Sequence, residues 1–205
     1  MRQRLADGLQ AMGLVVAEDL QQQLLMYLEL LARWNRVYNL TAITDPQLMV
    51  THHLLDSLAL RPYIVGERII DVGTGAGLPG IPLALLAPDQ TFVLVDSQAK
   101  KTRFIQQAVI ALELKNVETV TSRIEAYQPS VGFDVIIARA FGSLQDILQK
   151  TQRLARPHAG FVLPKGQYPQ SELDALTGEA YRVQVHSLQV PHLHNRHLVC
   201  IRAVS

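Results

Sequence analysis

The residues best suited to chemistry lie in a glycine-rich segment that spans residues 69–80. Gly73, Gly75 and Gly77 alternate directly after a short apolar run, and Asp71 stands inside that run. Closely spaced glycines let a backbone turn sharply and approach a ligand, and a helix that begins just after them offers free amide groups. Asp96 follows at a distance suited to binding the hydroxyl groups of a ribose. The pattern predicts a site for a cofactor that contains a nucleoside.

Two classes of cofactor fit this segment. The stretch from Gly75 to Gly80 matches G-x-G-x-x-G, the fingerprint of dinucleotide-binding dehydrogenases. With Asp71 as the starting point, the alternating glycines resemble the cofactor loop of class I S-adenosylmethionine-dependent methyltransferases. We favour the methyltransferase because the chain ends in two strand-like runs with no helix between them, and that fold ends in an antiparallel strand. A dehydrogenase and a non-catalytic RNA-binding module are the alternatives.

The elements that position this segment follow from hydrophobic periodicity. Short apolar runs alternate with helical stretches after residue 67, a pattern typical of a parallel sheet with right-handed crossovers. The expected strands are 68–72, 91–96, 117–121, 133–138 and 160–163, and the expected helices are 81–87, 101–114, 144–153 and 172–176. Residues 182–190 and 197–204 should pair as an antiparallel hairpin at one edge of the sheet.

The first 64 residues have a different pattern. Apolar residues at three- and four-residue spacing predict an amphipathic helix over residues 18–36. Asp45 and Pro46 suit the start of a second helix, which should end near Arg61. We therefore expect an N-terminal helical extension, residues 1–64, packed on a methyltransferase domain of residues 65–205. The predicted class is α/β: a Rossmann-like, mostly parallel sheet with a C-terminal antiparallel hairpin.

Composition and charge narrow the class of protein. The chain has 205 residues, of which 48% are hydrophobic and 18% charged, as in a globular protein. Its 19 basic and 18 acidic side chains exclude a strongly basic coat for nucleic acid, although residues 141–205 hold seven basic and four acidic ones. The single cysteine, Cys200, excludes an internal disulfide. We expect a cytoplasmic protein with no membrane segment and no metal, even at the cluster of His192, His194 and His197.

Several short strings resemble one family. W-N-x-x-x-N-L-T begins at Trp34, H-x-x-D-S begins at His53, and I-D-V-G-T-G-x-G-L-P-G-I begins at Ile70. The remaining strings are Arg139-Ala140-Phe141, Lys165-Gly166 and Arg196-His197-Leu198-Val199. Together they resemble the bacterial ribosomal RNA small subunit methyltransferase G family, also called glucose-inhibited division protein B. The resemblance implies methyl transfer from S-adenosylmethionine to N7 of a guanine, at position 527 in the 530 loop of 16S rRNA in the small ribosomal subunit. We expect the protein to act as a monomer.

The resemblance and the strand ends together suggest roles for individual residues. The expected cofactor-binding residues are Asp71, Gly73, Thr74, Gly75, Gly77, Leu78, Asp96, Ser97, Ile124, Glu125 and Arg139. Guanine N7 carries a lone pair and no proton, so we expect no general base. The expected substrate-positioning residues are Arg139, Lys165, His53, Asp56, Arg123 and Lys100, with Arg33, Arg36, Lys101 and Arg103 as further contacts to RNA.

Some of these roles stay open at the level of sequence. Arg139 and Lys165 follow strands at the carboxyl edge, where ligands of open sheets bind. Arg139 suits either the carboxylate of the cofactor or a phosphate of the target nucleotide. His53 and Asp56 suit either the substrate or a polar bridge between the extension and the domain. Asp71 suits either the orientation of the loop or the amino group of the cofactor.

Overall fold

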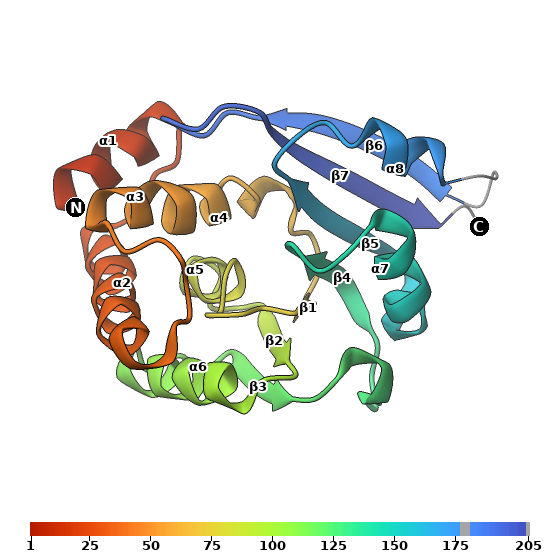
Figure 1. Cartoon of the computed structure of the whole chain (residues 1–205), viewed down its shortest axis with the longest axis horizontal. Coiled ribbons are helices and arrows are strands. Elements are labelled where there is room, and N and C mark those ends of the chain that lie inside the picture. Colours follow the sequence, from red (N-terminus) through yellow and green to blue (C-terminus); the bar gives the residue numbers. More distant parts are fainter. Residues whose placement is uncertain (177–180, 204–205) are drawn as a thin grey trace.

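A seven-stranded sheet forms the centre of the computed structural model, which describes residues 1–176 and 181–203 (Figure 1). The strands are β1 (Arg68–Val72), β2 (Thr91–Asp96), β3 (Val117–Thr121), β4 (Phe133–Ala138), β5 (Ala155–Lys165), β6 (Tyr181–Leu188) and β7 (Arg196–Ala203). Their order across the sheet is β3-β2-β1-β4-β5-β7-β6. The first five are parallel, and β7 runs antiparallel to both β5 and β6. The predicted parallel sheet with a terminal hairpin is confirmed.

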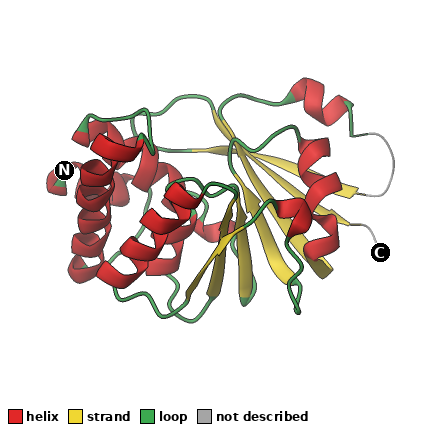
Figure 2. Cartoon of the chain, turned by 60° about the horizontal axis from the view of Figure 1, so that its bottom comes forward, coloured by secondary structure: helices red, strands yellow, loops and turns green. Residues whose placement is uncertain are grey.

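Helices cover both faces of the sheet (Figure 2). The α-helices are α1 (Arg2–Ala11), α2 (Glu18–Tyr38), α3 (Pro46–Met49), α4 (Asp56–Leu58), α5 (Gly80–Leu85), α6 (Ala99–Ala111), α7 (Leu144–Thr151) and α8 (Gln170–Asp174). A π-helix (Val50–Leu55) joins α3 to α4, and 3-10 turns occupy Arg61–Tyr63, Ile124–Ala126 and Gln152–Leu154. The N-terminal helices, α5 and α6 pack on one face, while α7 and α8 pack on the other. None of the helices in the described residues is long and apolar enough to cross a membrane.

Four of the predicted strands, β1 to β4, agree with the structure residue for residue. β1, β2 and β4 are short apolar runs buried between helices, whereas β3, at the edge of the sheet, alternates Val with polar residues and is only partly buried. Glycine or polar residues mark the ends of all four. The fifth strand, β5, is longer than predicted and begins at Ala155. Its early part contains Pro157 and His158, which hide the strand pattern. The last strand was expected to reach Val204, which lies outside the described residues.

The N-terminal region departs most from the prediction. Helix α1 was not expected, because it is short and Gly8 interrupts its run of good helix formers. In the structure Gly8 allows a close approach to Leu55, since a Cβ atom added there would collide with that side chain. The second predicted helix is broken up, with a π-helix between α3 and α4. Both features arise from packing between segments that are distant in the sequence.

The helical extension and the sheet share one hydrophobic core. Leu5, Leu28 and Leu54 from the extension belong to the same buried cluster as Phe92 and Leu198 from the sheet. Because the two parts are packed into one core, we expect them to unfold together. The division after residue 64 stays a prediction about the chain.

Candidate cofactor and substrate site

The glycine-rich loop is held in shape by Asp71, at the end of β1. Its Oδ2 atom accepts hydrogen bonds from the Thr74 hydroxyl at 2.6 Å and from the Gly80 amide at 2.9 Å. The side chain is fully buried, and this burial raises the pKa of Asp71 to about 6, while the two hydrogen bonds act in the opposite direction. Asp71 thus ties the start of the loop to the start of α5. Of its two expected roles, this geometry matches the orientation of the loop.

The amide groups of the loop are used mainly within the protein. Gly73 and Thr74 donate to the Val95 carbonyl, and Leu78 donates to the Thr74 carbonyl. Gly77 also donates to the Thr74 carbonyl. The amide of Leu78, one of the expected cofactor-binding residues, is therefore already engaged within the loop. Gly75 keeps the loop accessible: its φ is +63°, and a Cβ atom added there would meet no atom within 4 Å. This open space next to the backbone is what a closely approaching ligand needs.

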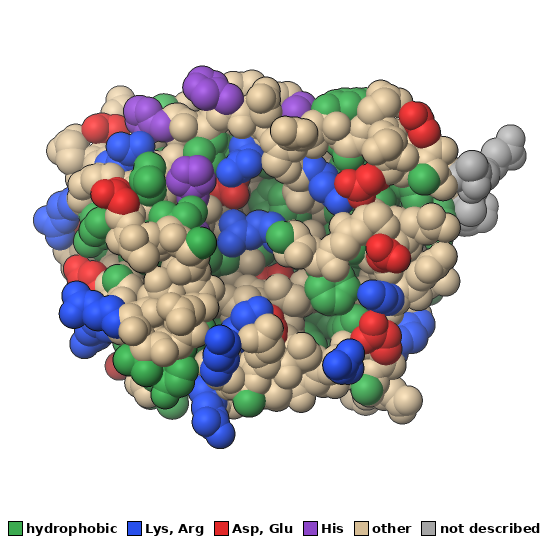
Figure 3. Space-filling view, in the orientation of Figure 1, with side chains coloured by type: hydrophobic (Ala, Val, Ile, Leu, Met, Phe, Trp, Pro, Cys, Tyr) green, Lys and Arg blue, Asp and Glu red, His purple; other side chains and the backbone are tan. Residues whose placement is uncertain are grey.

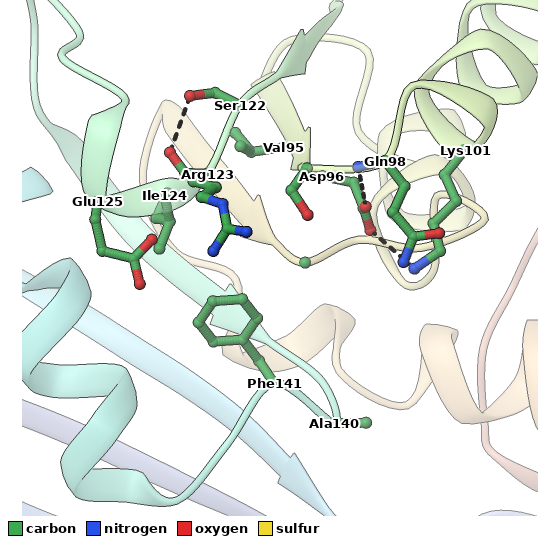
Figure 4. A pocket seen from close by; sticks show the side chains of 12 residues that line it. Val95, Asp96, Gln98, Lys101, Ser122, Arg123, Ile124, Glu125, Ala140 and Phe141 are labelled. Atoms are coloured by element: carbon green, nitrogen blue, oxygen red, sulfur yellow. Dashed lines mark hydrogen bonds and ion pairs between the residues drawn. The ribbon is translucent and has the colours of Figure 1, made fainter.

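A cavity of about 290 Å³ opens beside this loop at the carboxyl ends of β2, β3 and β4 (Figure 4). Five of the predicted cofactor residues line it, namely Gly73, Asp96, Ser97, Ile124 and Glu125. Arg123, which was predicted to position substrate, lines the same cavity. The other lining residues are Val95, Gln98, Lys101, Ser122, Ala140 and Phe141. Thr74, Gly75, Gly77, Leu78 and Asp71 are absent from the lining and instead build the loop.

Asp96 has the most constrained side chain in this cavity. One carboxylate oxygen accepts the Gly75 amide at 3.0 Å and lies 3.3 Å from the Lys101 ammonium. The other accepts the Gln98 amide at 2.9 Å, just before α6 (Figure 4). Asp96 therefore joins the glycine loop to α6, and a ribose hydroxyl would add to bonds that already orient the carboxylate.

Phe141 and Arg123 extend into the cavity from opposite sides (Figure 4). The Phe141 ring covers Gly73, where an added Cβ atom would collide with it. The Lys150 ammonium lies 5.7 Å from the centre of the same ring. An aromatic face at this place offers stacking to a planar base. Phe141 is not among the predicted site residues, although the R-A-F string contains it.

A second cavity, of about 410 Å³, adjoins the first and shares Ala140 with it. Four of the predicted substrate-positioning residues line it: His53, Asp56, Arg139 and Lys165. The other lining residues are Ile43, His52, Ala140, Pro164, Gly166, Leu188, Arg196 and His197. The space-filling view shows Lys and Arg side chains gathered around a hollow at the centre of the molecule (Figure 3).

Each cation of the second cavity faces a carboxylate. Asp56 lies between two arginines, 3.4 Å from Arg139 Nη1 and 3.1 Å from Arg196 Nε. Lys165 Nζ lies 2.7 Å from Glu172 and also donates to the Gly142 carbonyl at 3.2 Å. These pairs hold the basic groups in fixed positions and leave the lining with an excess of positive charge. Arg196 was quoted in a family string, yet only the structure places it beside Asp56.

His53 belongs to a buried polar bridge. Its Nε2 atom lies 3.0 Å from the Thr41 hydroxyl, and the Asn35 side chain bonds both the amide and the carbonyl of Thr41. Burial and, to a smaller extent, the charge of Arg139 together lower the pKa of His53 to about 4. The imidazole is therefore neutral near pH 7. The bridge links the end of α2 to the π-helix.

Several predicted residues lie apart from both cavities. Lys100 donates to the Tyr38 carbonyl at 3.0 Å and so fastens α6 to the end of α2. Arg33, Arg36 and Arg103 line neither cavity. Within the described residues, no group of three or more His, Cys, Asp or Glu side chains is placed to hold a metal ion.

Comparison with known proteins gives these cavities a context. The family model described as rRNA small subunit methyltransferase G matches residues 20–200. The chain belongs to this methyltransferase family. The protein of that name from Aeromonas salmonicida is 48% identical over 97% of this chain and 96% of its own length. The protein from Coxiella burnetii is 46% identical over 98% of both chains, and the one from Psychromonas ingrahamii is 49% identical over 94% and 93%.

Solved structures identify the architecture of this family member as the class I S-adenosylmethionine-dependent methyltransferase fold. A ribosomal protein L11 methylase from Lactobacillus delbrueckii matches with a TM-score of 0.60, at 15% identity, over 80% of this chain and 81% of that one. The N-methyltransferase NodS from Bradyrhizobium japonicum, solved with S-adenosyl-L-homocysteine, matches with a TM-score of 0.58. Its identity is 14%, over 87% of this chain and 98% of that one. The prediction of a methyltransferase, and not a dehydrogenase, is confirmed by the family match.

Proposed function

We propose that this protein transfers a methyl group from S-adenosylmethionine to N7 of one guanine of bacterial 16S rRNA, in the 530 loop. We further propose that it acts in the cytoplasm, as a monomer and without a metal ion. The observation that carries the proposal is the meeting of two cavities at Ala140. One lies beside the glycine loop and Asp96, and the other is lined by basic side chains.

The first cavity fits the cofactor. When bound, S-adenosylmethionine supplies an electrophilic methyl group on its sulfonium. Asp96 offers carboxylate oxygens for the ribose hydroxyls, Phe141 offers an aromatic face, and Ile124 and Glu125 form the wall expected beside the adenine. The open space at Gly75 permits close approach of the methionine portion.

The second cavity fits a nucleotide of the substrate. Three basic side chains of this cavity hold phosphate groups. Arg139 and Arg196 each offer a planar set of donors that can form two hydrogen bonds, and Lys165 offers a single ammonium charge. Because N7 carries a lone pair and no proton, these residues need only place the guanine in line with the methyl group. The neutral His53 supports the wall of the cavity and is not required as a base. A base extruded from its stack would enter here.

Methylation at N7 makes the guanine ring cationic, so bare positive charge beside the ring would oppose the reaction. The negative charge of Asp56 reduces this repulsion, since its carboxylate faces both Arg139 and Arg196. The arginines therefore retain their hydrogen-bond donors for phosphate while the local potential stays lower. This arrangement suits a reaction in which positive charge moves onto the substrate.

The decisive experiment is transfer of a labelled methyl group to small ribosomal subunits that lack the modification, followed by mapping of the labelled base. We expect label on one guanine of the 530 loop, and methylation at N7 makes that guanine sensitive to reductive strand cleavage. Label elsewhere, or on another atom, would contradict the proposal. RNA binding that does not lead to transfer would favour the non-catalytic module.

A further inference from the structure

A third hollow, of about 350 Å³, lies on the sheet away from the two cavities of the site. It is formed by β5, β6 and β7 together with the 3-10 turn Arg61–Tyr63, and it shares no lining residue with those cavities. Its lining includes Arg182, Gln184 and His186 on β6, and Cys200 and Arg202 on β7. The N-terminal helices cover the neighbouring part of this sheet face around Leu188. This end of the face is left open.

Two arginines stand opposite each other in this hollow. Arg182 on β6 pairs in register with Arg202 on β7, and both side chains are exposed. Like charges directly opposite on neighbouring strands destabilise a sheet unless an anion lies between or above them. His186 and Gln184 add further hydrogen-bonding groups on the same strand. The described residues that line the hollow include no acidic side chain.

The two arginines also differ from the other basic residues of the C-terminal part. Residues 141–205 hold seven lysines and arginines in all, including these two. Five have partners: Lys150 with Glu125, Arg153 with the Ile124 carbonyl, Arg156 with Asp134, Lys165 with Glu172 and Arg196 with Asp56. Arg182 and Arg202 have no acidic or carbonyl partner among the residues that the structure describes. In this part of the chain, the two basic side chains without such a partner among the described residues therefore lie together in the hollow.

Strand β7 runs from the second cavity of the site to this hollow. Arg196 and Arg202 lie on the same strand, β7, and six residues of strand span about 20 Å. Because their separation is an even number of residues, both side chains project from the same face of the sheet. One of them lines the second cavity of the site, and the other lines the third hollow. A ligand that reaches both must be a long polyanion.

We propose that the hollow around Arg182 and Arg202 binds the phosphate backbone of the rRNA substrate, at a point remote from the methylated guanine. This inference rests on the function proposed above. The contact carries no base specificity, because guanidinium groups that grip phosphates fix register and orientation. It gives the enzyme a second point of attachment, so that the substrate is oriented before the guanine enters its cavity.

The test is binding of unmethylated small subunits to the double variant Arg182→Ala/Arg202→Ala across a salt series. We expect an affinity about tenfold lower at low salt. The slope of log affinity against log salt should fall by about 1.5, since each lost phosphate contact removes about 0.7–0.9. Affinity for S-adenosylmethionine, measured by calorimetry, should equal that of the wild type. The variant Arg182→Lys/Arg202→Lys should recover most of the salt slope.

The matched control is Arg2→Ala/Lys115→Ala, which removes two exposed charges outside all three cavities. An equal loss in this control would show an effect of net charge and overturn the inference, as would an unchanged slope in the double variant. A photoreactive benzoylphenylalanine in place of Gln184 identifies the partner: a crosslink to rRNA supports the proposal, and a crosslink only to ribosomal protein overturns it. Methyl transfer by the wild type on the same subunits tests the proposed function separately.

Discussion

At the scale of single residues, three carboxylates organise the site, and each does so through a different kind of partner. Asp71 binds a hydroxyl and an amide inside the glycine loop, whereas Asp96 joins that loop to Lys101. Asp56 faces two arginines in the second cavity. All three carboxylates are already engaged by partners within the protein. The proposed reaction needs no base from them, because guanine N7 has no proton to lose.

The first prediction concerns Gly75→Ala. Its φ of +63° makes any side chain strained by about 1–2 kcal/mol, and the new methyl group would occupy the open space at the loop. We expect S-adenosylmethionine affinity to fall at least about tenfold while the protein stays folded. Calorimetric titration measures the affinity. Gly13→Ala is the matched control, because Gly13 has a φ of +66° and equally open surroundings outside the site, so it should lose stability without losing affinity.

The second prediction concerns Lys165→Ala. Loss of the ammonium group should slow methyl transfer by about 10- to 100-fold through misplacement of the substrate, with cofactor affinity nearly unchanged. Single-turnover rates on unmethylated subunits measure this effect. Glu172→Gln removes the ion pair and keeps the Lys165 charge. If Glu172→Gln slowed transfer as strongly as Lys165→Ala, the lysine would act through the fold and not on the substrate.

At the scale of elements, the N-terminal helices reach into the cofactor loop. The Tyr27 hydroxyl on α2 donates to the Ala76 carbonyl at 2.7 Å, between two of the glycines. Tyr27 is fully buried, and this burial raises the pKa of its hydroxyl well above the usual range. The extension therefore supports the shape of the loop as well as covering one face of the sheet.

The third prediction follows from this hydrogen bond. Tyr27→Phe leaves the Ala76 carbonyl without its partner and should lower stability by about 1–2 kcal/mol. Cofactor affinity should fall a few-fold, because the loop loses a restraint. Urea unfolding and calorimetry measure the two effects. Tyr38→Phe on the same helix removes the hydroxyl of an exposed tyrosine and should change neither quantity. Equal results for the two variants would refute the role of Tyr27.

The fourth prediction concerns the π-helix and its buried His53. The folded-state pKa of about 4 lies below the ordinary 6.5, so the folded protein binds fewer protons than the unfolded chain between these values. The contribution of the neutral His53 to the free energy of unfolding is complete above about pH 6.5. It is lost as the pH falls toward 4, by up to about 3 kcal/mol. Asp71, with its raised pKa, acts in the opposite direction, since its contribution is lost as the pH rises through about 6.

The measurement is the free energy of unfolding between pH 4.5 and 7 for wild type and His53→Gln. The difference between them should shrink or reverse as the pH falls, because only the wild type must protonate a buried imidazole. His194→Gln changes an exposed histidine, and its free energy of unfolding should differ from that of the wild type by a constant amount over this pH range. A pH-independent difference for His53→Gln would contradict the buried, neutral imidazole.

At the scale of the whole molecule, charge is almost balanced yet unevenly placed. The chain has a formal net charge of +1, with basic side chains around the second cavity and the hollow of Arg182 and Arg202. We therefore expect attraction to RNA to come from these local clusters and not from overall charge. The shared core keeps these clusters in fixed relative positions.

The fifth prediction belongs to this scale. Affinity for the small subunit should fall steeply as salt rises from about 50 to 200 mM, because phosphate contacts release counterions. Affinity for S-adenosylmethionine should change far less, since that site holds a small ligand of low net charge. Filter binding and calorimetry over one salt series measure both. Salt-insensitive subunit binding would mean that the basic side chains do not contact phosphate.

The strands β1 to β4, the position of the glycine loop and the terminal hairpin could all be predicted from the sequence. Each depends on short-range features: an apolar run, the glycines that end it, and the absence of a helix between two strands. Family strings added the expected chemistry. Most residues of the first cavity were predictable for this reason, since they follow directly after a strand. The second cavity was less predictable, because it also takes residues from the N-terminal helices and from β6 and β7.

Contacts between residues that are distant in the sequence could not be predicted and became known from the folded structure. Gly8 permits α1 to pack on Leu55, Tyr27 bonds the loop 49 residues away, and Arg196 reaches Asp56. The π-helix, the internal use of the loop amides and the facing arginines Arg182 and Arg202 also lack a local sequence signal. The physical reason is that local periodicity reports which face of an element is buried. Which side chain lies opposite depends on long-range packing and strand register.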